Sequence, residues 1–244
     1  MAYRVNAELI ERVRSGDWSR GSGRDREHQD ALAARGYWQA FQQVKASIGT
    51  MLAGQNAGDV AQHDHGVWYR ERFGPSVAAG IVRAADLAGY RNGPVCIRHS
   101  MHVPPRAEAV RDLLPAFFNH LRQASEPAVR VVLGHFAFVY VHPYLDGNGR
   151  MGRFLMNAML ASGGYPWTVV PLAMRDRYVA ALESSQRRPR HRAVCRFAGG
   201  TARTAPAPLP GRARPGSNEN PPGRRGGPVH VRFLSAFAMT PAAT

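Results

Sequence analysis

The chain has 244 residues, a formal charge of +15 and a hydrophobic content of 44%. This length and apolar content suffice for a real core in one large or two small domains. No apolar run approaches the ~18 residues of a membrane span, and the first residues lack the apolar stretch of a secretory signal. Cys96 and Cys195 lie in unrelated contexts, so we expect reduced thiols and a cytoplasmic protein.

The positive charge, which by itself would suggest nucleic-acid binding, is concentrated near the C-terminus. Residues 187–244 contain eleven arginines and one acid and carry +10, whereas residues 1–186 carry +5. Lys45 is the only lysine beside thirty-one arginines, a bias that a GC-rich gene produces without selection for binding. Nucleic acid is therefore an expected partner only through the basic tail, and no membrane partner is expected.

The N-terminal part of the chain has helical periodicity. Apolar residues recur at spacings of three and four from Gln29 to Leu52, and a second helix is expected from about Val60 to Phe73. After Gly74 and Pro75 the pattern predicts a third, shorter helix from Ser76 to Leu87. Such helices, each with one apolar side, are typical of a bundle.

Residues 90–105, which we call the flap, have a different pattern. Asn-Gly-Pro at residues 92–94 is a turn signal ahead of a short β-prone run, and Pro104 and Pro105 follow. Prolines are excluded from a helix interior because they lack the amide donor and clash with the preceding turn. The pattern predicts a small β-hairpin. We expect this hairpin to cover the glycine-rich loop that comes later in the chain.

Helical periodicity returns in the second half of the chain. Helices are expected from Glu108 to Leu121 and from Ala128 to Val141, the latter buried on nearly all sides. Met151 to Ala161 forms another, closed by Gly163-Gly164 as a C-cap, and Met174 to Ser184 forms the last. The predicted fold class is thus mainly α, a helical bundle with a small hairpin flap.

Three segments divide the chain: an N-terminal helical segment (residues 1–60), a central domain (residues 61–186) and a tail (residues 187–244). The tail is rich in Arg, Pro and Gly and has little hydrophobic periodicity. We expect it to be disordered, because it cannot bury enough apolar area to offset its ordering entropy. Out-of-frame translation of a GC-rich gene would give the same composition and stays an alternative explanation.

Between two apolar helices lies a polar, glycine-rich loop, His-Pro-Tyr-Leu-Asp-Gly-Asn-Gly-Arg-Met-Gly-Arg (residues 142–153). Loops on buried supports are where chemistry is usually placed. Gly147, Asn148 and Gly149 can turn successive backbone N–H groups to one concave side. The helix that follows adds the positive end of its dipole, so the loop is suited to an anion.

The charged side chains of this loop specify the anion further. Arg150 and Arg153 are one helical turn apart and suit a polyphosphate. Asp146 would repel phosphate unless Mg²⁺ lay between them, although an aspartate here can also cap the helix. His142, with an ordinary pKa near ~6.5, can take a proton from a hydroxyl at neutral pH. These residues predict a phosphoryl or nucleotidyl transfer site.

Residues 142–153 closely resemble the motif of the Fic family, part of the Fic/Doc superfamily. Every defining position is filled, with Tyr144 where phenylalanine is more common. The resemblance extends from about Val67 to Glu183, so it identifies residues 61–186 as a Fic domain and leaves out the tail. It implies the mostly helical Fic fold and a protein adenylyltransferase (AMPylation) activity, in which AMP passes from ATP to a Ser, Thr or Tyr hydroxyl of a target protein.

The resemblance also implies a role for each site residue. These roles are His142 as general base, Asp146 as the Mg²⁺ ligand, Gly147, Asn148 and Gly149 as the anion hole, and Arg150 and Arg153 as polyphosphate ligands. Tyr144 would be buried beneath the loop as a packing anchor. Flap residues Val95, Ile97 and Arg98 would align the target segment as an added strand.

Two other interpretations compete with a transferase. One is a non-catalytic basic protein that binds nucleotide or nucleic-acid phosphate, and the other is a Fic-type enzyme inactivated by an altered C-terminus. Many Fic proteins carry an inhibitory Ser/Thr-x-x-x-Glu helix, and no such spacing precedes Glu27, Glu71 or Glu183. A separate antitoxin-like partner and the absence of any inhibition therefore both stay open. Histidines outside the loop lack partners at metal-ligand spacing and are expected to be structural: His99, His102, His120 and His135.

Overall fold

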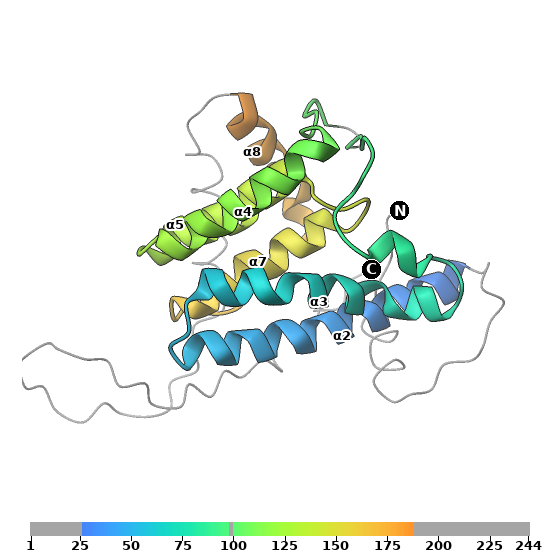
Figure 1. Cartoon of the computed structure of the whole chain (residues 1–244), viewed down its shortest axis with the longest axis horizontal. Helices are drawn as coiled ribbons and strands as arrows, with labels where there is room; N and C mark the ends of the chain where they lie inside the picture. Colours follow the sequence, from blue (N-terminus) through green and yellow to red (C-terminus); the bar gives the residue numbers. More distant parts are fainter. Residues whose placement is uncertain (1–25, 98–99, 188–244) are drawn as a thin grey trace, which may run out of the picture.

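The computed structural model describes residues 26–97 and 100–187, which are almost entirely helical (Figure 1). The α-helices are α2 (Arg26–Leu52), α3 (Ala57–Ala78), α4 (Ala107–Gln123), α5 (Pro127–Val132), α6 (Phe138–Val141), α7 (Asn148–Ser162) and α8 (Arg175–Arg187). A π-helical turn, η2 (Leu133–Ala137), joins α5 to α6, and η1 (Ala84–Leu87) and η3 (Leu172–Met174) are short 3₁₀ turns. None of the helices in these ranges combines the length and apolar character needed to cross a bilayer.

Helices α2 and α3 lie side by side as an antiparallel pair, and α7 packs across them toward α4 and α5 (Figure 1). The α2–α3 pair is close because Gly36 has no side chain: a Cβ there would lie 2.1 Å from the Arg72 carbonyl oxygen. Trp68, which is fully buried, donates its indole N–H to Ser47 Oγ at 3.1 Å. Phe41 and Trp68 both belong to the hydrophobic core.

Helix α7 is the centre of the bundle, because it contacts α2, α3, α5, α6 and η2. Most of its residues are buried, and Phe154, Leu155 and Met159 have no exposed surface. It ends in a glycine cap in which Tyr165 donates its backbone N–H to Leu160 and Gly164 has a φ of 82°. The predicted glycine cap is confirmed, and a helix held on so many sides gives the preceding loop a rigid support.

Two helix predictions need correction. α3 does not end at Phe73 but continues to Ala78, with Pro75 inside it. Pro75 is buried, and this burial offsets the hydrogen bond that proline cannot donate. The predicted helix from Ser76 to Leu87 is accordingly wrong, and only η1 forms there. The helix predicted at residues 128–141 is confirmed as a helical run that η2 interrupts. Its predicted burial on nearly all sides is wrong, since Val129 and Tyr140 are exposed.

The flap is without regular structure where it is described. No strand is assigned in residues 26–97 or 100–187, so the expected hairpin is not confirmed. Pro94, Pro104 and Pro105 lack amide donors and cannot contribute to a continuous ladder. Arg98 and the tail from residue 188 onward lie outside the described residues, which leaves the predicted disorder of the tail untested.

Candidate functional site

The loop of residues 142–153 begins at a histidine in a rare backbone conformation. His142 ends α6 with φ 52° and ψ 58°, the only positive φ of a non-glycine residue in the part of the chain that the structure describes. Its N–H still donates to the Phe138 carbonyl at 3.0 Å. A left-handed non-glycine residue is unfavourable and persists only where its surroundings hold it. The loop therefore starts from a constrained turn.

The imidazole of His142 is half-buried and anchored on one side. Nδ1 lies 3.2 Å from the Val139 carbonyl oxygen, which can only accept, so Nδ1 carries the proton and Nε2 keeps its lone pair. Burial lowers the pKa of His142, with Arg91 and His102 adding to the lowering and the Val139 hydrogen bond opposing it. The ring is therefore neutral at pH 7 and suited to accept a proton.

Arg91, in the flap, holds the turn at His142 from outside the motif. It is 3% exposed and donates from Nε to the His142 carbonyl at 2.8 Å and from Nη1 to the Gly93 carbonyl at 3.0 Å. Nη2 donates to the Pro105 carbonyl, and the Arg91 backbone N–H donates to the Pro143 carbonyl at 2.8 Å. One side chain thus connects both arms of the flap to the start of the loop.

The middle of the loop is closed by the Asn148 side chain. Oδ1 accepts from the Tyr144 N–H at 2.9 Å, and Nδ2 donates to the Tyr144 carbonyl at 2.8 Å. Asn148 is 1% exposed, so both hydrogen bonds are shielded from water. The side chain is therefore a brace across the loop, while the Asn148 backbone N–H lies at the N-terminus of α7.

Helix α3 is the floor beneath this brace. The Tyr144 ring stacks on Tyr69 with centroids 3.6 Å apart and planes 6° from parallel. Gly147 has a φ of 82°, and a Cβ there would lie 3.1 Å from Phe73 Cε2. The prediction that Tyr144 is a buried anchor is confirmed, since it is 2% exposed. Tyr69 and Phe73, which support the loop from below, were not predicted as site residues.

The N-terminus of α7 presents free backbone N–H groups at the end of the loop. Gly147 is the N-cap, and its carbonyl accepts from the N–H groups of Arg150 and Met151. Asn148 and Gly149 come before the first residue whose N–H donates within the helix, so their own N–H groups have no intrahelical acceptor. No side chain caps the helix, and Asp146 is exposed. Asp146 is therefore not the N-cap, which leaves its carboxylate available to a ligand.

Both motif arginines lie half-buried on the first two turns of α7. Arg153 Nη1 is 3.7 Å from the position of a Cβ on Gly149, which places its guanidinium beside the glycine-rich turn. Arg150 and Arg153 both act electrostatically on buried Tyr37 of α2. Two positive charges and a helix N-terminus at one place favour a ligand with more than one negative charge.

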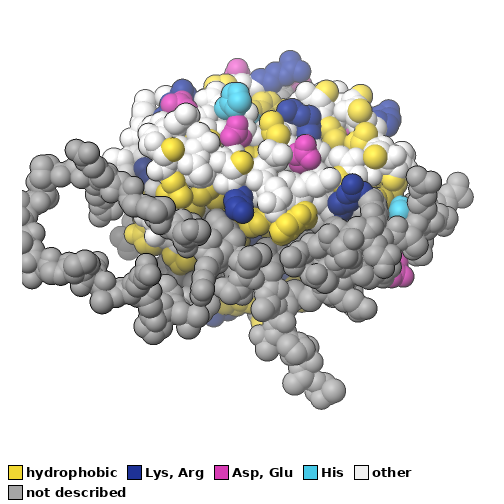
Figure 2. All heavy atoms as spheres, turned by 90° about the horizontal axis from the view of Figure 1, so that it is seen from below, with side chains coloured by type: hydrophobic (Ala, Val, Ile, Leu, Met, Phe, Trp, Pro, Cys, Tyr) yellow, Lys and Arg dark blue, Asp and Glu magenta, His cyan; other side chains and the backbone are white. Residues whose placement is uncertain are grey.

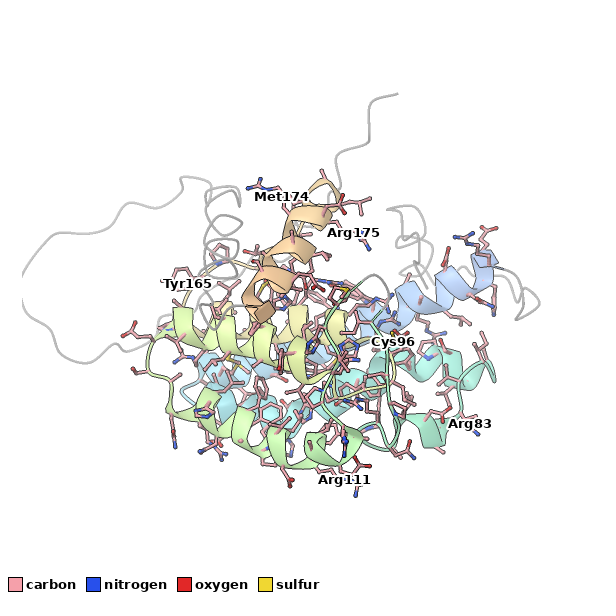
Figure 3. All side chains as sticks on the ribbon, turned by 90° about the horizontal axis from the view of Figure 1, so that it is seen from above. Arg83, Cys96, Arg111, Tyr165, Met174 and Arg175 are labelled. Atoms are coloured by element: carbon pink, nitrogen blue, oxygen red, sulfur yellow. The ribbon has the colours of Figure 1, made fainter. Side chains whose placement is uncertain are left out.

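The structure brings most of the predicted residues together and leaves one out. The segment that joins α6 to α7, together with the start of α7, carries His142, Asp146, residues 147–149 and both arginines. Val95 and Ile97 are half-buried in the flap, whose position Cys96 marks in Figure 3, and Arg98 lies outside the described residues. In the described ranges, no three His, Cys, Asp or Glu side chains cluster as metal ligands. A metal here would need further ligands from a substrate.

Arg91 is the main functional residue that sequence reasoning missed. In the sequence, Arg91 is distinguished only by its position directly before the Asn-Gly-Pro turn, and this turn predicts a loop. An arginine in a loop is ordinarily a solvated residue, and its burial follows from four carbonyl oxygens converging on it. Except for Gly93, those acceptors come from distant positions along the chain, so periodicity and motif spacing could not reveal them.

Sequence comparison finds a family that resembles this part of the chain. The Fic/DOC family matches residues 71–160. Protein adenylyltransferase Fic of Nematostella vectensis is 35% identical over 110 residues, which are 43% of this chain and 25% of that protein. Protein adenylyltransferase fic-1 of Caenorhabditis elegans is 30% identical over 106 residues, or 43% of this chain and 20% of that protein. The chain thus spans a quarter or less of these curated relatives.

Structural comparison finds the same fold. Fic-1 residues 134–508 from C. elegans superpose with a TM-score of 0.66 at 20% identity, covering 82% of this chain and 56% of that one. A Fic family protein from Desulfovibrio desulfuricans G20 gives 0.60 at 24% identity, covering 82% and 58%. Residues 71–160 thus match the Fic/DOC family in sequence, and the described helices share the fold of solved Fic proteins.

Proposed function

We propose that this chain is a protein adenylyltransferase that transfers AMP from ATP to a Ser, Thr or Tyr hydroxyl of a target protein. The names of its curated relatives support this activity. The observation that carries the proposal is the pairing of His142 with the α7 N-terminus in one braced loop. No described group bonds to His142 Nε2, and the neutral ring has a lone pair there.

The proposed reaction is a displacement at the α-phosphorus of ATP. The target hydroxyl oxygen bonds to this phosphorus as its proton passes to His142 Nε2. The bond from the α-phosphorus to the oxygen that bridges to the β-phosphorus breaks, and pyrophosphate leaves with the electron pair. The backbone N–H groups of Asn148 and Gly149, with Gly147 shaping the turn, stabilise charge on the phosphate, while Arg150 and Arg153 hold the polyphosphate.

Mg²⁺ fits the residues present at this site. Asp146 offers an exposed carboxylate that no helix cap uses. Mg²⁺ is commonly held by one or two carboxylates and by substrate phosphates rather than by a full protein cage. When bound at Asp146, the ion would neutralise phosphate charge beside a carboxylate that otherwise repels it.

The proposed partner is a target protein that lies along the flap. Residues 95–97 have no strand pairing within the described chain, which suits them to pair with an added strand, although the Ile97 carbonyl already accepts from the Ser100 N–H at 3.1 Å. Val95 and Ile97 would align this segment, with Arg98 proposed from sequence alone. An antitoxin-like inhibitor also remains a proposal, because no described helix supplies the inhibitory spacing.

Simple phosphate docking explains fewer features of this site. A neutral histidine contributes no charge to anion binding, yet His142 is kept neutral in a constrained turn. On the face drawn in Figure 2, basic and acidic side chains of the described residues are interspersed and form no continuous basic patch. A transferase activity therefore accounts for the histidine, the glycine-rich turn at residues 147–149 and the two arginines together.

The direct test uses α-labelled ATP and Mg²⁺ with cell lysate. We expect labelled protein bands with the wild-type chain and none with His142→Ala. His63→Ala, an exposed histidine on α3, is the matched control and should label as the wild type does. Equal labelling by His142→Ala would contradict the proposed base, and ATP binding without any labelling would favour a non-catalytic or inactivated protein.

A further inference from the structure

The π-helical turn η2 places a buried histidine against α7. His135 is 3% exposed, and its Nδ1 lies 3.2 Å from the position of a Cβ on Gly152. The same Cβ would be 2.7 Å from Val139 Cγ2, so glycine at position 152 is what allows the ring to lie on the helix. π-helical turns are frequent at functional sites, and the proposed reaction does not use this histidine.

The other ring nitrogen of His135 reaches α8. Nε2 lies 2.8 Å from the Tyr178 hydroxyl oxygen, and the Arg153 side chain forms a hydrogen bond with the same hydroxyl. A guanidinium can only donate, so the Tyr178 oxygen accepts from Arg153 and directs its own proton to His135 Nε2. Burial lowers the pKa of His135 to about 4, which keeps the ring neutral and able to accept.

The result is a connected row of side chains that ends at the glycine-rich turn. On one side Arg153 contacts Tyr178, and on the other its Nη1 lies beside Gly149. An arginine side chain has many rotamers, and fixing it before a ligand arrives removes part of the entropic cost of binding. A second hydrogen bond, from Ser100 in the flap to Glu183, also holds α8 in place.

We propose that Tyr178, held by His135, positions Arg153 for the outer phosphates of the nucleotide and so makes α8 part of the nucleotide site. This inference rests on the proposed function, in which Arg153 is a polyphosphate ligand. α8 lies beyond residues 71–160, where the family match ends. Tyr178 is a positioning residue, because it acts through Arg153 and not on the substrate.

The test compares ATP and AMP binding to the full chain by titration calorimetry. Tyr178→Phe removes only the hydroxyl and should weaken ATP binding about tenfold, the size of one lost hydrogen bond to a charged group. AMP lacks the outer phosphates, so its affinity should not change. Tyr165→Phe is the matched control, since Tyr165 is half-exposed and lies away from flap residue Cys96 in Figure 3.

Arg153→Ala completes a double-mutant cycle. We expect Tyr178→Phe to have no further effect on ATP affinity once Arg153 is removed. An equal loss for ATP and AMP, or an undiminished effect in the Arg153→Ala background, would overturn the positioning role. Thermal unfolding of each variant by circular dichroism separates a folding defect from a binding defect.

The same titrations distinguish this inference from the proposed function. If Arg153→Ala weakens ATP binding but Tyr178→Phe does not, only the positioning role of Tyr178 fails. If the wild-type chain binds no ATP, the proposed function fails and this inference fails with it. Loss of ATP affinity in both single variants, with AMP affinity unchanged, supports both.

Discussion

Arg91 Nε donates a hydrogen bond to the His142 carbonyl oxygen at 2.8 Å, although 51 residues separate the two along the chain. This bond holds a left-handed histidine that its own sequence neighbours would not favour. The same guanidinium also donates to the Gly93 and Pro105 carbonyls. Arg91 therefore holds both the flap and His142 in place. A change in the flap therefore reaches the imidazole through the backbone.

Replacing Arg91 by methionine should lower kcat by about a hundredfold, because small displacements of a catalytic group have effects of this order. Loss of the Arg91 charge should also raise the pKa of His142, since Arg91 lowers it in the wild type. The acidic limb of kcat/KM would then move to higher pH. Steady-state transfer rates between pH 5 and 8 measure both effects.

Arg83→Met is the control for this substitution, because Arg83 is exposed and paired only with Asp86. It should leave kcat and the pH profile unchanged. An Arg91→Met enzyme with a wild-type pH profile and kcat would show that the hydrogen bonds at His142 are not needed for activity.

Asn148→Ala should destabilise the protein by about 3 kcal/mol, because it leaves the buried Tyr144 N–H and carbonyl without their partners. Urea unfolding monitored by circular dichroism gives this difference in unfolding free energy. Asn119→Ala, at an exposed position on α4, should change it by less than ~0.5 kcal/mol. Equal effects of the two substitutions would rule out the brace.

Gly147→Ala tests the contact between the loop and α3. The new Cβ would lie 3.1 Å from Phe73 in a backbone with φ of 82°, so we expect a loss of roughly 2–4 kcal/mol from strain and crowding. Gly54→Ala separates the two causes, because Gly54 has a φ of 102° and open space around it. It should cost about 1 kcal/mol, and similar losses at both glycines would mean that Phe73 does not restrict the loop.

The buried His135 should make stability depend on pH. Burial lowers its pKa to about 4 in the folded protein, while the unfolded chain titrates near ~6.5. The unfolded state therefore binds more protons between these values, and the stabilisation present above pH ~6.5 is lost as the pH falls toward 4, by on the order of 3 kcal/mol. In urea unfolding at several pH values, His135→Gln should remove this part of the dependence. A wild-type dependence in His135→Gln would contradict a buried neutral ring.

The helices could be predicted from sequence where their apolar periodicity was strong. α2, α4 and α7 begin and end within a few residues of the predictions. The errors occurred at Pro75, where burial outweighed the expected helix end, and in the flap, where a β-prone run with three prolines formed no strand. In both places the local sequence preference existed, but the packing of the surrounding residues outweighed it.

The sequence by itself determined the resemblance to a family and the chemical content of the site, because twelve consecutive residues carry the histidine, the carboxylate, the glycine-rich turn and both arginines. Only the tertiary structure decided how these groups are held. Arg91, Tyr69 and Tyr178 come from the flap, α3 and α8, and each acts on the loop across a large separation in sequence. Local patterns encode backbone preferences, whereas the position of a side chain depends on which distant residues fold against it, and that is set by the packing of the whole bundle.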